Sequence, residues 1–373
     1  MGLALISACV EVAETRPDSP ATLVTGTTSD GENPGWEQLD SPPVQSRIWN
    51  TTTWTGSELL VWGGVVPERG LALDDGAAFD PRSREWRSLA ASPLDRRVGH
   101  TAVWTGEKLF VWGGHPGGTG FRPRDRFNDG AAYDPETDTW SPIADAPLTG
   151  GPGYTAVWAG TEMVVLGGND GYMSSPEMGL GEGATYDPSS DTWREISFPT
   201  PMLTMDAVWT GSEVLAYAVE EYLGTLHGLG YDPLTESWRE LPDSPISTPM
   251  PDVELIGDHL VVWSYDPGEE GVAALRVDNE EWQSLPRFPG RPSDGTPNAA
   301  ALGPDLLLMQ EEAEIALYSI GGSEWHPVPW PAVEIGPFVV PPVWTGDEAL
   351  FYEGNFSRFW SYRPDPALLT SSS

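Results

Sequence analysis

Seven arginines lie in or beside long polar segments between residues 47 and 126 of this 373-residue chain, whose formal net charge is −37. A guanidinium group binds a carboxylate or a phosphate through two parallel hydrogen bonds. Arginines gathered in an otherwise acidic protein therefore predict a pocket for a small anion. The candidate ligand-binding arginines are Arg47, Arg69, Arg96, Arg97, Arg122, Arg124 and Arg126.

Two histidines in the same region are candidates for acid–base chemistry. His100 and His115 could act as a general base and its partner, because an imidazole titrates near neutral pH. A lone histidine at the start of a strand, however, more often caps backbone groups. Both interpretations stay open, and the sequence assigns no catalytic residue.

Further polar residues are predicted to face a central channel. Asp206, Asp252 and Asn298 begin expected strands, and their side chains would bind a cation or sugar hydroxyls. No EF-hand or comparable calcium loop is present, so we predict neither a specific metal site nor a bound cofactor. The candidate ligand-binding set is completed by Tyr154, Asn169, Asp170 and Asp206.

A repeated unit must position these residues, and its tryptophans reveal it. The clearest copies end in a tryptophan preceded by Tyr-Asp-Pro, as in YDPETDTW. Together with Trp36, the closing tryptophans recur every 43 to 54 residues, a period typical of the blades of a β-propeller. Copies lie at 79–86, 133–140, 186–193, 231–238, 275–282 and 318–325.

Each period divides into four strand-like pieces. The second piece is apolar at successive positions, which is typical of a strand covered on both faces. Tryptophans are predicted to fill the wedge between blades, and a glycine pair such as Gly113-Gly114 to let the backbone leave the sheet where a side chain would collide. Seven second strands are expected, starting near Leu59, Leu109, Met163, Val214, Leu260, Leu306 and Ala349.

The two ends of the repeat region are predicted to share one blade. The last unit has three strand-like pieces, PPVW, EALFYE and SRFWSY, and no fourth. The segment GWEQL at 35–39 matches a fourth strand and has no three strands before it. We therefore expect an N-terminal strand to complete the seventh blade and close the ring.

The composition agrees with an all-β protein and excludes some partners. The chain has 18 Trp, 42 Gly and 37 Pro, which favour many short strands separated by turns. Its 56 acidic residues against 19 basic ones would repel nucleic acid and anionic lipid surfaces. We therefore expect no nucleic-acid partner, and contact with a membrane only through an attached lipid.

The repeat resembles that of the kelch family over about 35–363. The resemblance implies a seven-bladed kelch-type β-propeller, all-β, and places the chain among bacterial, extracytoplasmic kelch-like proteins. Later units depart from the family pattern where the glycine pair is expected. The resemblance rests on Gly63-Gly64, Gly113-Gly114 and Gly167-Gly168, and on the pairs Phe79/Trp86, Tyr133/Trp140, Tyr186/Trp193 and Tyr231/Trp238.

The same resemblance implies a structural role for two of the candidate arginines. Arg47 and Arg97 each lie three residues before Asn50 or His100, the position of the structural arginine of a kelch first strand. The arginines of the RPRDR segment at 122–126 could likewise pair with neighbouring carboxylates. A ligand pocket and local ion pairs thus remain alternatives.

The long loops after the second and fourth strands share one face of a propeller, where binding residues usually lie. We expect this face to bind a small anionic carbohydrate or a protein partner, which would make the propeller a binding or interaction module. We also expect a monomer. The alternative is an enzyme acting on a sugar acid, because the fold resembles kelch-type sialic acid mutarotases. Relatives of this fold include copper radical oxidases of the galactose oxidase type, whose chemistry needs a cysteine cross-linked to a tyrosine inside the propeller. Cys9 is the only cysteine and lies outside the propeller, which argues strongly against this chemistry.

The N-terminal segment indicates export. LISAC at 5–9 resembles the lipobox of bacterial lipoproteins, and a polar segment follows it. We expect a signal and tether at 1–34, the propeller at 35–364 and a tail at 365–373. The protein would then lie in the cell envelope or outside the cell, with a lipid at Cys9.

Lipidation at Cys9 predicts a defined mature N-terminus. Signal cleavage before the cysteine should leave Cys9 as the first residue, with its mass increased by the acyl chains. Mass spectrometry of the natively produced protein measures this directly. An unprocessed Met1 from a verified start codon would contradict the lipoprotein hypothesis.

Overall fold

The structure is a computed structural model, and every regular element in the part of the chain that it describes is a β-strand. The chain divides into two compact units, 1–32 and 33–373, and all described residues belong to the second. The described residues are 35–67, 69–118, 125–169, 179–199, 204–219, 225–247, 252–263, 271–289, 298–303, 305–311, 314–329, 341–355 and 357–365.

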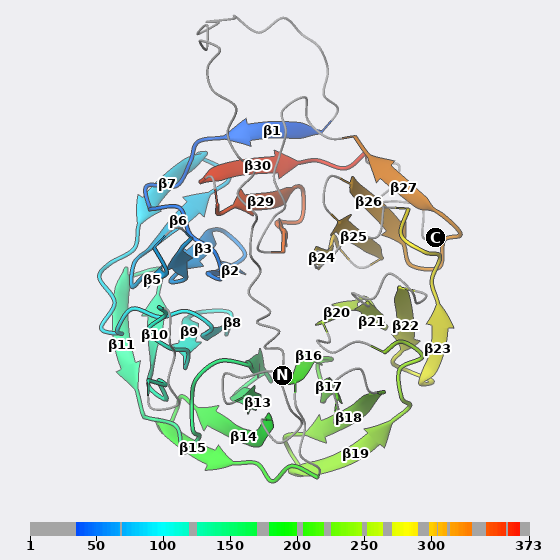
Figure 1. The fold of residues 1–373 in the computed structure, drawn as a ribbon, viewed down its shortest axis with the longest axis horizontal. Coiled ribbons are helices and arrows are strands. Elements are labelled where there is room, and N and C mark those ends of the chain that lie inside the picture. Colours follow the sequence, from blue (N-terminus) through cyan, green and yellow to red (C-terminus); the bar gives the residue numbers. More distant parts are fainter. Residues whose placement is uncertain are drawn as a thin grey trace, which may run out of the picture. The chain divides into compact units, whose positions relative to one another are not determined.

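Seven four-stranded antiparallel sheets surround a centre, as Figure 1 shows, so the seven-bladed propeller predicted from the repeat is confirmed. We number the blades along the chain. Blade 1 contains β2 (Thr51–Trp54), β3 (Leu59–Trp62), β6 (Gly76–Asp80) and β7 (Glu85–Ser88). Blade 2 contains β8 (Thr101–Trp104), β9 (Leu109–Trp112), β10 (Gly130–Asp134) and β11 (Thr139–Ile143).

The next blades repeat this order of strands. Blade 3 contains β12 (Tyr154–Trp158), β13 (Met163–Asn169), β14 (Gly179–Asp187) and β15 (Thr192–Glu195). Blade 4 contains β16 (Thr204–Trp209), β17 (Val214–Val219), β18 (Leu226–Asp232) and β19 (Ser237–Leu241). Blade 5 contains β20 (Asp252–Ile256), β21 (His259–Trp263), β22 (Val272–Arg276) and β23 (Glu281–Ser284).

Blade 6 contains β24 (Asn298–Ala301), β25 (Leu306–Glu311), β26 (Glu314–Ser319) and β27 (Trp325–Val328). Blade 7 joins both ends of the repeat region: β28 (Val343–Trp344), β29 (Ala349–Glu353) and β30 (Arg358–Tyr362) pair in order, and β1 (Trp36–Leu39) adds the outer strand. The predicted closure by an N-terminal strand is therefore confirmed, with Trp36 opposite Tyr362.

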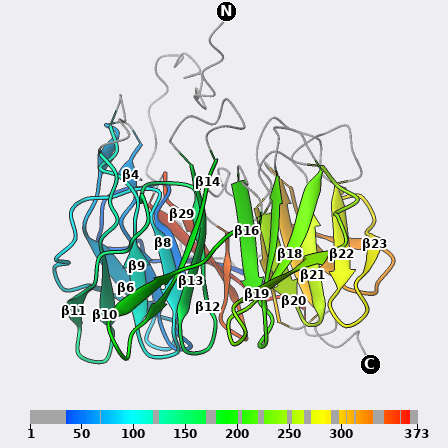
Figure 2. The same ribbon diagram turned by 90° about the horizontal axis from the view of Figure 1, so that it is seen from below.

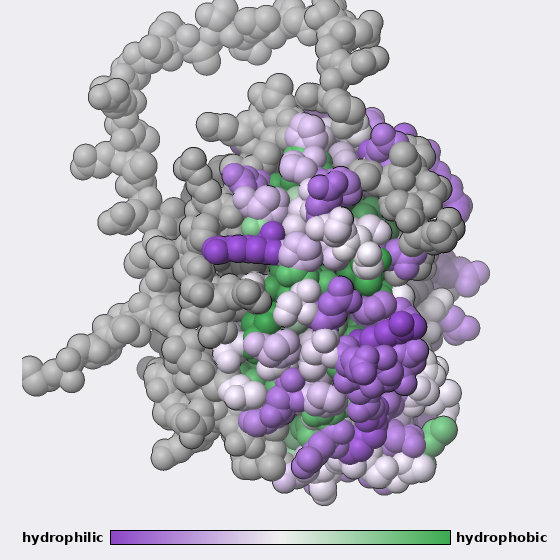
Figure 3. All heavy atoms as spheres, turned by 90° about the vertical axis from the view of Figure 1, so that its right-hand side faces the viewer, coloured by the Kyte–Doolittle hydropathy of each residue, from purple (hydrophilic) through white to green (hydrophobic). Residues whose placement is uncertain are grey.

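The hydrophobic core lies between the blades. The second strands β3, β9 and β17 are buried along their whole length. Trp62 of blade 1 packs in one cluster with Leu109 and Tyr133 of blade 2. The tryptophans of the second strands therefore fill the wedge between neighbouring sheets, as the sequence predicted. On the side of β23 and β27, Figure 3 shows a mostly hydrophilic outer surface with hydrophobic side chains in narrow strips.

The glycine pairs end the second strands where neighbouring blades approach closely. Gly63 and Gly64 have φ angles of +66° and +91°, in the left-handed region that favours glycine. A Cβ atom on Gly63 would lie 2.6 Å from Cε1 of His100, and one on Gly64 would lie 2.7 Å from the carbonyl oxygen of Ile48. In the pair named by the prediction, a Cβ atom on Gly114 would lie 2.8 Å from the carbonyl oxygen of Val98, whereas one on Gly113 would come no closer than 3.5 Å to any atom, so the predicted collision holds for Gly114 and not for Gly113.

The outer strands are tied to each other by tryptophan side chains. The indole N–H of a fourth-strand tryptophan donates a hydrogen bond to a backbone carbonyl that follows the fourth strand of the preceding blade. In blades 1, 2, 3, 4 and 6 the tryptophan ring also packs on the aromatic residue seven positions earlier, with 5.0 Å between the ring centroids of Tyr133 and Trp140. These bonds run from Trp36 to Pro329, Trp86 to Asp40, Trp140 to Ala90, Trp193 to Ala144, Trp282 to Pro242, and Trp325 to Pro286.

Removing β1 should open the ring. Deleting residues 1–33 leaves β1 intact and should not change the melting temperature. Deleting residues 1–40 should lower it sharply, because loss of the packed Trp36 side chain alone costs roughly 3–5 kcal/mol. Thermal unfolding of the two truncated proteins compares these outcomes. Equal melting temperatures would show that β1 contributes nothing to closure.

Candidate functional site

The connections between strands divide the propeller into two faces. We call the face that carries the loops after the second and fourth strands the loop face, and the opposite one the hairpin face. On the loop face, β4 (Val65–Val66) and β5 (Leu71–Ala72) form a small hairpin that rises above blade 1 (Figure 2). It is extended by the bridges Ile48 to Val65, Leu71 to Gly117, Leu73 to Arg97 and Val98 to His115. We call this extension the lip.

Arg47 and Arg97 lie beneath the loop face, and both are 0% exposed. Arg47 donates to the carbonyl oxygen of Gly63 at 3.0 Å and pairs with Asp75 at 2.9 Å. Arg97 makes the equivalent contacts with Gly113 and Asp129, each at 2.9 Å. The prediction that these two arginines bind a ligand needs correction. Their guanidinium groups are enclosed, and their hydrogen bonds and ion pairs fix the segments that precede the first strands of blades 1 and 2.

The other predicted arginines divide by exposure. Arg69 and Arg96 are exposed on the lip, and Nε of Arg96 lies 3.6 Å from a carboxylate oxygen of Asp74. Arg126 is half-buried, with its aliphatic part against Gly151. The predicted residues that lie outside the described part of the chain are Cys9, Arg122, Arg124 and Asp170. Asn169 ends β13, and only its backbone belongs to the described part.

The two histidines are not arranged as a catalytic pair. His100 is buried, its Nε2 lies 3.2 Å from Thr51 Oγ1 of blade 1, and its ring meets Trp62 edge-on. Burial, and then the charge of Arg97, lower the pKa of His100 to about 3, so the ring is neutral. Burial also lowers the pKa of His115, whose Nδ1 accepts from the Gly117 backbone. His100 thus links two inner strands through the Thr51 side chain, and not by capping backbone groups as the structural alternative had it.

Tyr154 belongs to a separate polar cluster near the loop face. Its hydroxyl donates to Glu182 at 2.7 Å, and the same carboxylate accepts from the backbone of Thr149 at 2.7 Å. Burial raises the pKa of Tyr154, with the Glu182 hydrogen bond adding to the shift, so the phenol stays protonated. Glu182 was not predicted, because only the pairing of β12 and β14 with opposite edges of β13, where Gly167 lies between the two residues, brings it to Tyr154.

Asp206 connects three inner strands. Its Oδ1 accepts from Thr155 Oγ1 of β12 at 2.9 Å, and its Oδ2 accepts from the backbone N–H of Val253 in β20 at 3.0 Å. Burial raises its pKa against the opposing effect of these hydrogen bonds. Asp206 was predicted to bind a cation or sugar hydroxyls; its two oxygens are instead engaged with neighbouring strands.

Asp252 and Glu254 of β20 carry two more carboxylates, which lie near Asp206 of β16. Burial, with the charge of Asp206 as the next cause, raises the pKa of Asp252 and of Glu254 to about 7 each. Glu254 accepts a backbone hydrogen bond from Ala301 of blade 6. The sequence signal for Glu254 was its place two residues after Asp252, on the same side of the strand. Among the residues that the structure describes, no group of three or more His, Cys, Asp or Glu is arranged to hold a metal ion.

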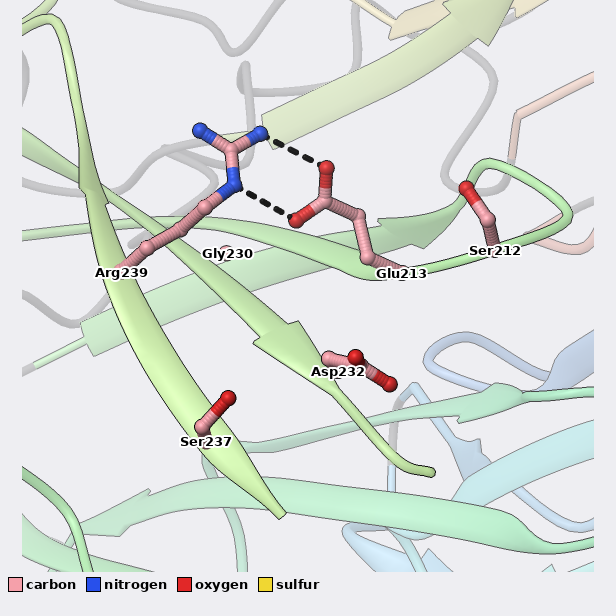
Figure 4. Close-up of a pocket in the computed structure, with 6 residues that line it drawn as sticks. All are labelled: Ser212, Glu213, Gly230, Asp232, Ser237 and Arg239. Carbon is pink, nitrogen blue, oxygen red and sulfur yellow. Dashed lines mark hydrogen bonds and ion pairs between the residues drawn. The ribbon is translucent and has the colours of Figure 1, made fainter. Parts of the chain in front are cut away.

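The hairpin face carries polar hollows, and the wall of one of them is formed by the protein's own ion pairs. A hollow of about 310 Å³ in blade 4 is lined by Glu213, Asp232 and Arg239 (Figure 4). Arg239 binds Glu213 through two hydrogen bonds of 2.9 and 2.7 Å and also reaches Glu280 of blade 5. Equivalent triads are Glu58, Arg87 and Asp138, and Glu162, Arg194 and Glu236.

The comparisons with known proteins agree with this architecture. The model of the KLHDC2/KLHL20/DRC7 Kelch-repeats domain matches residues 29–217, which span β1 and the strands up to β17. No curated protein matches the chain. In the described part of the chain, no helix has the length and apolar character needed to cross a membrane.

The carboxylates on β20 predict a stability that depends on pH. A carboxyl group whose pKa is raised by folding stabilises the folded state most at low pH, and this contribution is lost as the pH rises through its folded pKa. Between pH 5.5 and 8, the free energy of unfolding of Glu254→Gln should therefore fall less than that of the unmodified protein, by on the order of 1 kcal/mol. The melting temperature of the variant should fall less steeply over the same range. Thermal unfolding at several pH values measures the slope, with the exposed Glu195→Gln as control. Identical slopes for Glu254→Gln and the unmodified protein would contradict this account.

Proposed function

Since this chain belongs to the kelch-repeat family, we propose that it acts as an extracytoplasmic interaction module that binds a partner protein with its loop face. A kelch propeller suggests a protein-interaction module. The finer elements of the proposal are the lip as the contact surface, an anionic partner segment, and export with lipidation at Cys9. The last of these rests on the sequence LISAC alone.

The main observation behind the proposal is that Trp49 is exposed to solvent and has a left-handed backbone conformation. Its side chain is 59% exposed and its φ angle is +54°. Blade 2 has Gly99 at the equivalent position, with a φ of +68°. A bulky residue in the left-handed region costs roughly 1–3 kcal/mol, and such strain is typical of binding surfaces. An exposed indole in this conformation does nothing for the core, which favours a role in contact with a partner.

The surroundings of Trp49 suggest the chemistry of that partner. Leu71 on β5 is 53% exposed, so two of the three exposed large hydrophobic side chains among the described residues lie on the lip. Arg69 and Arg96 lie on the same lip and are exposed. Apolar anchors beside guanidinium groups favour a segment that combines an apolar side chain with carboxylates.

The enzyme alternative has less support among the described residues. Catalysis on a sugar acid would need an acid–base pair near the exposed arginines. His100 is enclosed and neutral, and the carboxylates with raised pKa lie on β16 and β20, in blades other than those that form the lip. A small anionic carbohydrate remains the other ligand class that exposed arginines would accept.

Replacing Trp49 should separate binding from folding. Peptides selected from a random display library on the immobilised propeller should combine apolar and acidic residues. Trp49→Gly should weaken their binding about tenfold or more, because aromatic anchors dominate interface energies. Its melting temperature should stay equal or rise, since glycine relieves the left-handed strain.

Leu234→Ala is the matched control, because Leu234 is 93% exposed and lies in a turn of the hairpin face. This variant should bind the selected peptides like the unmodified protein. Unchanged binding by Trp49→Gly would refute the lip as the contact surface. Selection of no acidic peptides, together with a thermal shift by sugar acids, would favour the carbohydrate ligand instead.

A further inference from the structure

A second open hollow lies on the hairpin face, between blades 1 and 2. It has a volume of about 540 Å³ and is bounded by the first hairpins of both blades and by the turn after β10. We call it the blade 1–2 hollow. One wall is the half-buried indole of Trp104, at the end of β8. The hollow is on the face opposite to the lip, so it is independent of the proposed loop-face function.

Carboxylates dominate the rim of the blade 1–2 hollow. Glu58, Glu107, Asp134 and Glu136 line it, and the only cation in its lining is Lys108. Glu107 and Glu136 are exposed, and neither has an ion pair in the part of the chain that the structure describes. An aromatic wall with carboxylates around it is suited to a cation that can stack and donate several hydrogen bonds at once.

We propose that the blade 1–2 hollow is an interaction surface that receives an arginine side chain from a basic segment of a partner protein. The guanidinium plane would stack on Trp104, and its N–H groups would donate to Glu107 and Glu136. The hollow is open and wide enough for a long side chain, and its charge opposes that of the segment. The propeller would then bind two partners, one on each face.

The protein itself shows that this surface chemistry binds guanidinium groups. Glu58, on the same rim, holds Arg87 through bonds of 2.6 and 3.0 Å, although both side chains are partly exposed to solvent. The hairpin-face arginines of blades 3 and 4 each contact two carboxylates in the same manner. Elsewhere Arg97 stacks on the ring of Phe127, with 4.5 Å from the guanidinium carbon to the ring centroid. Carboxylate pairing and ring stacking of arginine therefore both occur in this fold.

Lys108 is the one residue in the lining of the blade 1–2 hollow whose charge would repel an arginine. It is the only lysine of the chain, and it stands where the first hairpins of blades 1, 3 and 4 have Glu58, Glu162 and Glu213. Lys108 makes no ion pair in the described part of the protein, and its charge opposes a cationic partner. Lys108→Glu should therefore strengthen binding of an arginine-bearing segment, whereas a purely structural lysine would not affect binding.

The test uses a fluorescent decapeptide with three arginines separated by glycine and serine, and an otherwise identical peptide with citrulline. Fluorescence anisotropy should show binding of the arginine peptide alone, weakened by added salt. The variant Glu107→Gln/Glu136→Gln should bind it about fivefold more weakly, and Lys108→Glu more tightly than the unmodified protein.

The matched control is Glu195→Gln/Glu240→Gln, which removes two exposed carboxylates from the fourth strands of blades 3 and 4 and so changes the net charge equally. It should leave the affinity near that of the unmodified protein, as should Trp49→Gly. Equal weakening by both double variants would show a general charge effect and overturn the proposal. So would binding of the citrulline peptide, or no binding of either peptide at physiological salt.

Discussion

The ring depends on the tryptophan of the outer strand, which in six of the seven blades donates a hydrogen bond to the backbone that follows the outer strand of the blade before it. The inner strands of neighbouring blades contact each other around the centre, but the sheets diverge outward. The gap must be filled by large side chains, and the exposed backbone after each fourth strand needs a partner. An indole meets both needs, because its rings fill the gap while its N–H reaches the carbonyl of the neighbouring blade. Blade 4 is the exception: Trp238 stacks on Phe198 at 4.8 Å, and its N–H finds no acceptor among the described atoms.

This constraint explains which parts of the sequence predicted the fold. Tryptophan and its preceding aromatic residue must recur at the outer strand, and the second strand must be apolar on both faces. Six second strands begin at the predicted residue, and β21 begins one residue earlier, at His259, because the strand ladder continues to Ile256. Closure by β1 was predictable for the same reason, since Trp36 is an outer-strand tryptophan without a preceding blade of its own.

The candidate site was harder to predict, because burial is set by residues distant in sequence. Arg97 is enclosed because Gly113 and Asp129 lie beside it in the folded blade, and the only local sign of this was the resemblance to the kelch pattern, in which an arginine three residues before His100 is structural. Trp49 was not predicted to be exposed, since most tryptophans of this repeat fill the core. The comparison that distinguishes it is internal: blade 2 has Gly99 at the same position. Glu182 was missed because its partner Tyr154 comes from another strand.

The composition of the cations follows from the same architecture. Of 19 basic residues, 18 are arginines, and four of those in the described part, Arg84, Arg87, Arg194 and Arg239, join carboxylates across a blade boundary. The planar guanidinium can bind two carboxylates in fixed directions, whereas an ammonium group acts as a point charge. Arginine is therefore the cation suited to bridging blades in a chain of charge −37. Arg69, Arg96 and Lys108 differ from these bridging arginines, because all three are exposed and none of them contacts a carboxylate of a neighbouring blade in the described structure. They lie on opposite faces of the propeller, Arg69 and Arg96 on the loop face and Lys108 on the hairpin face, so each face presents an exposed cation that bridges no blades.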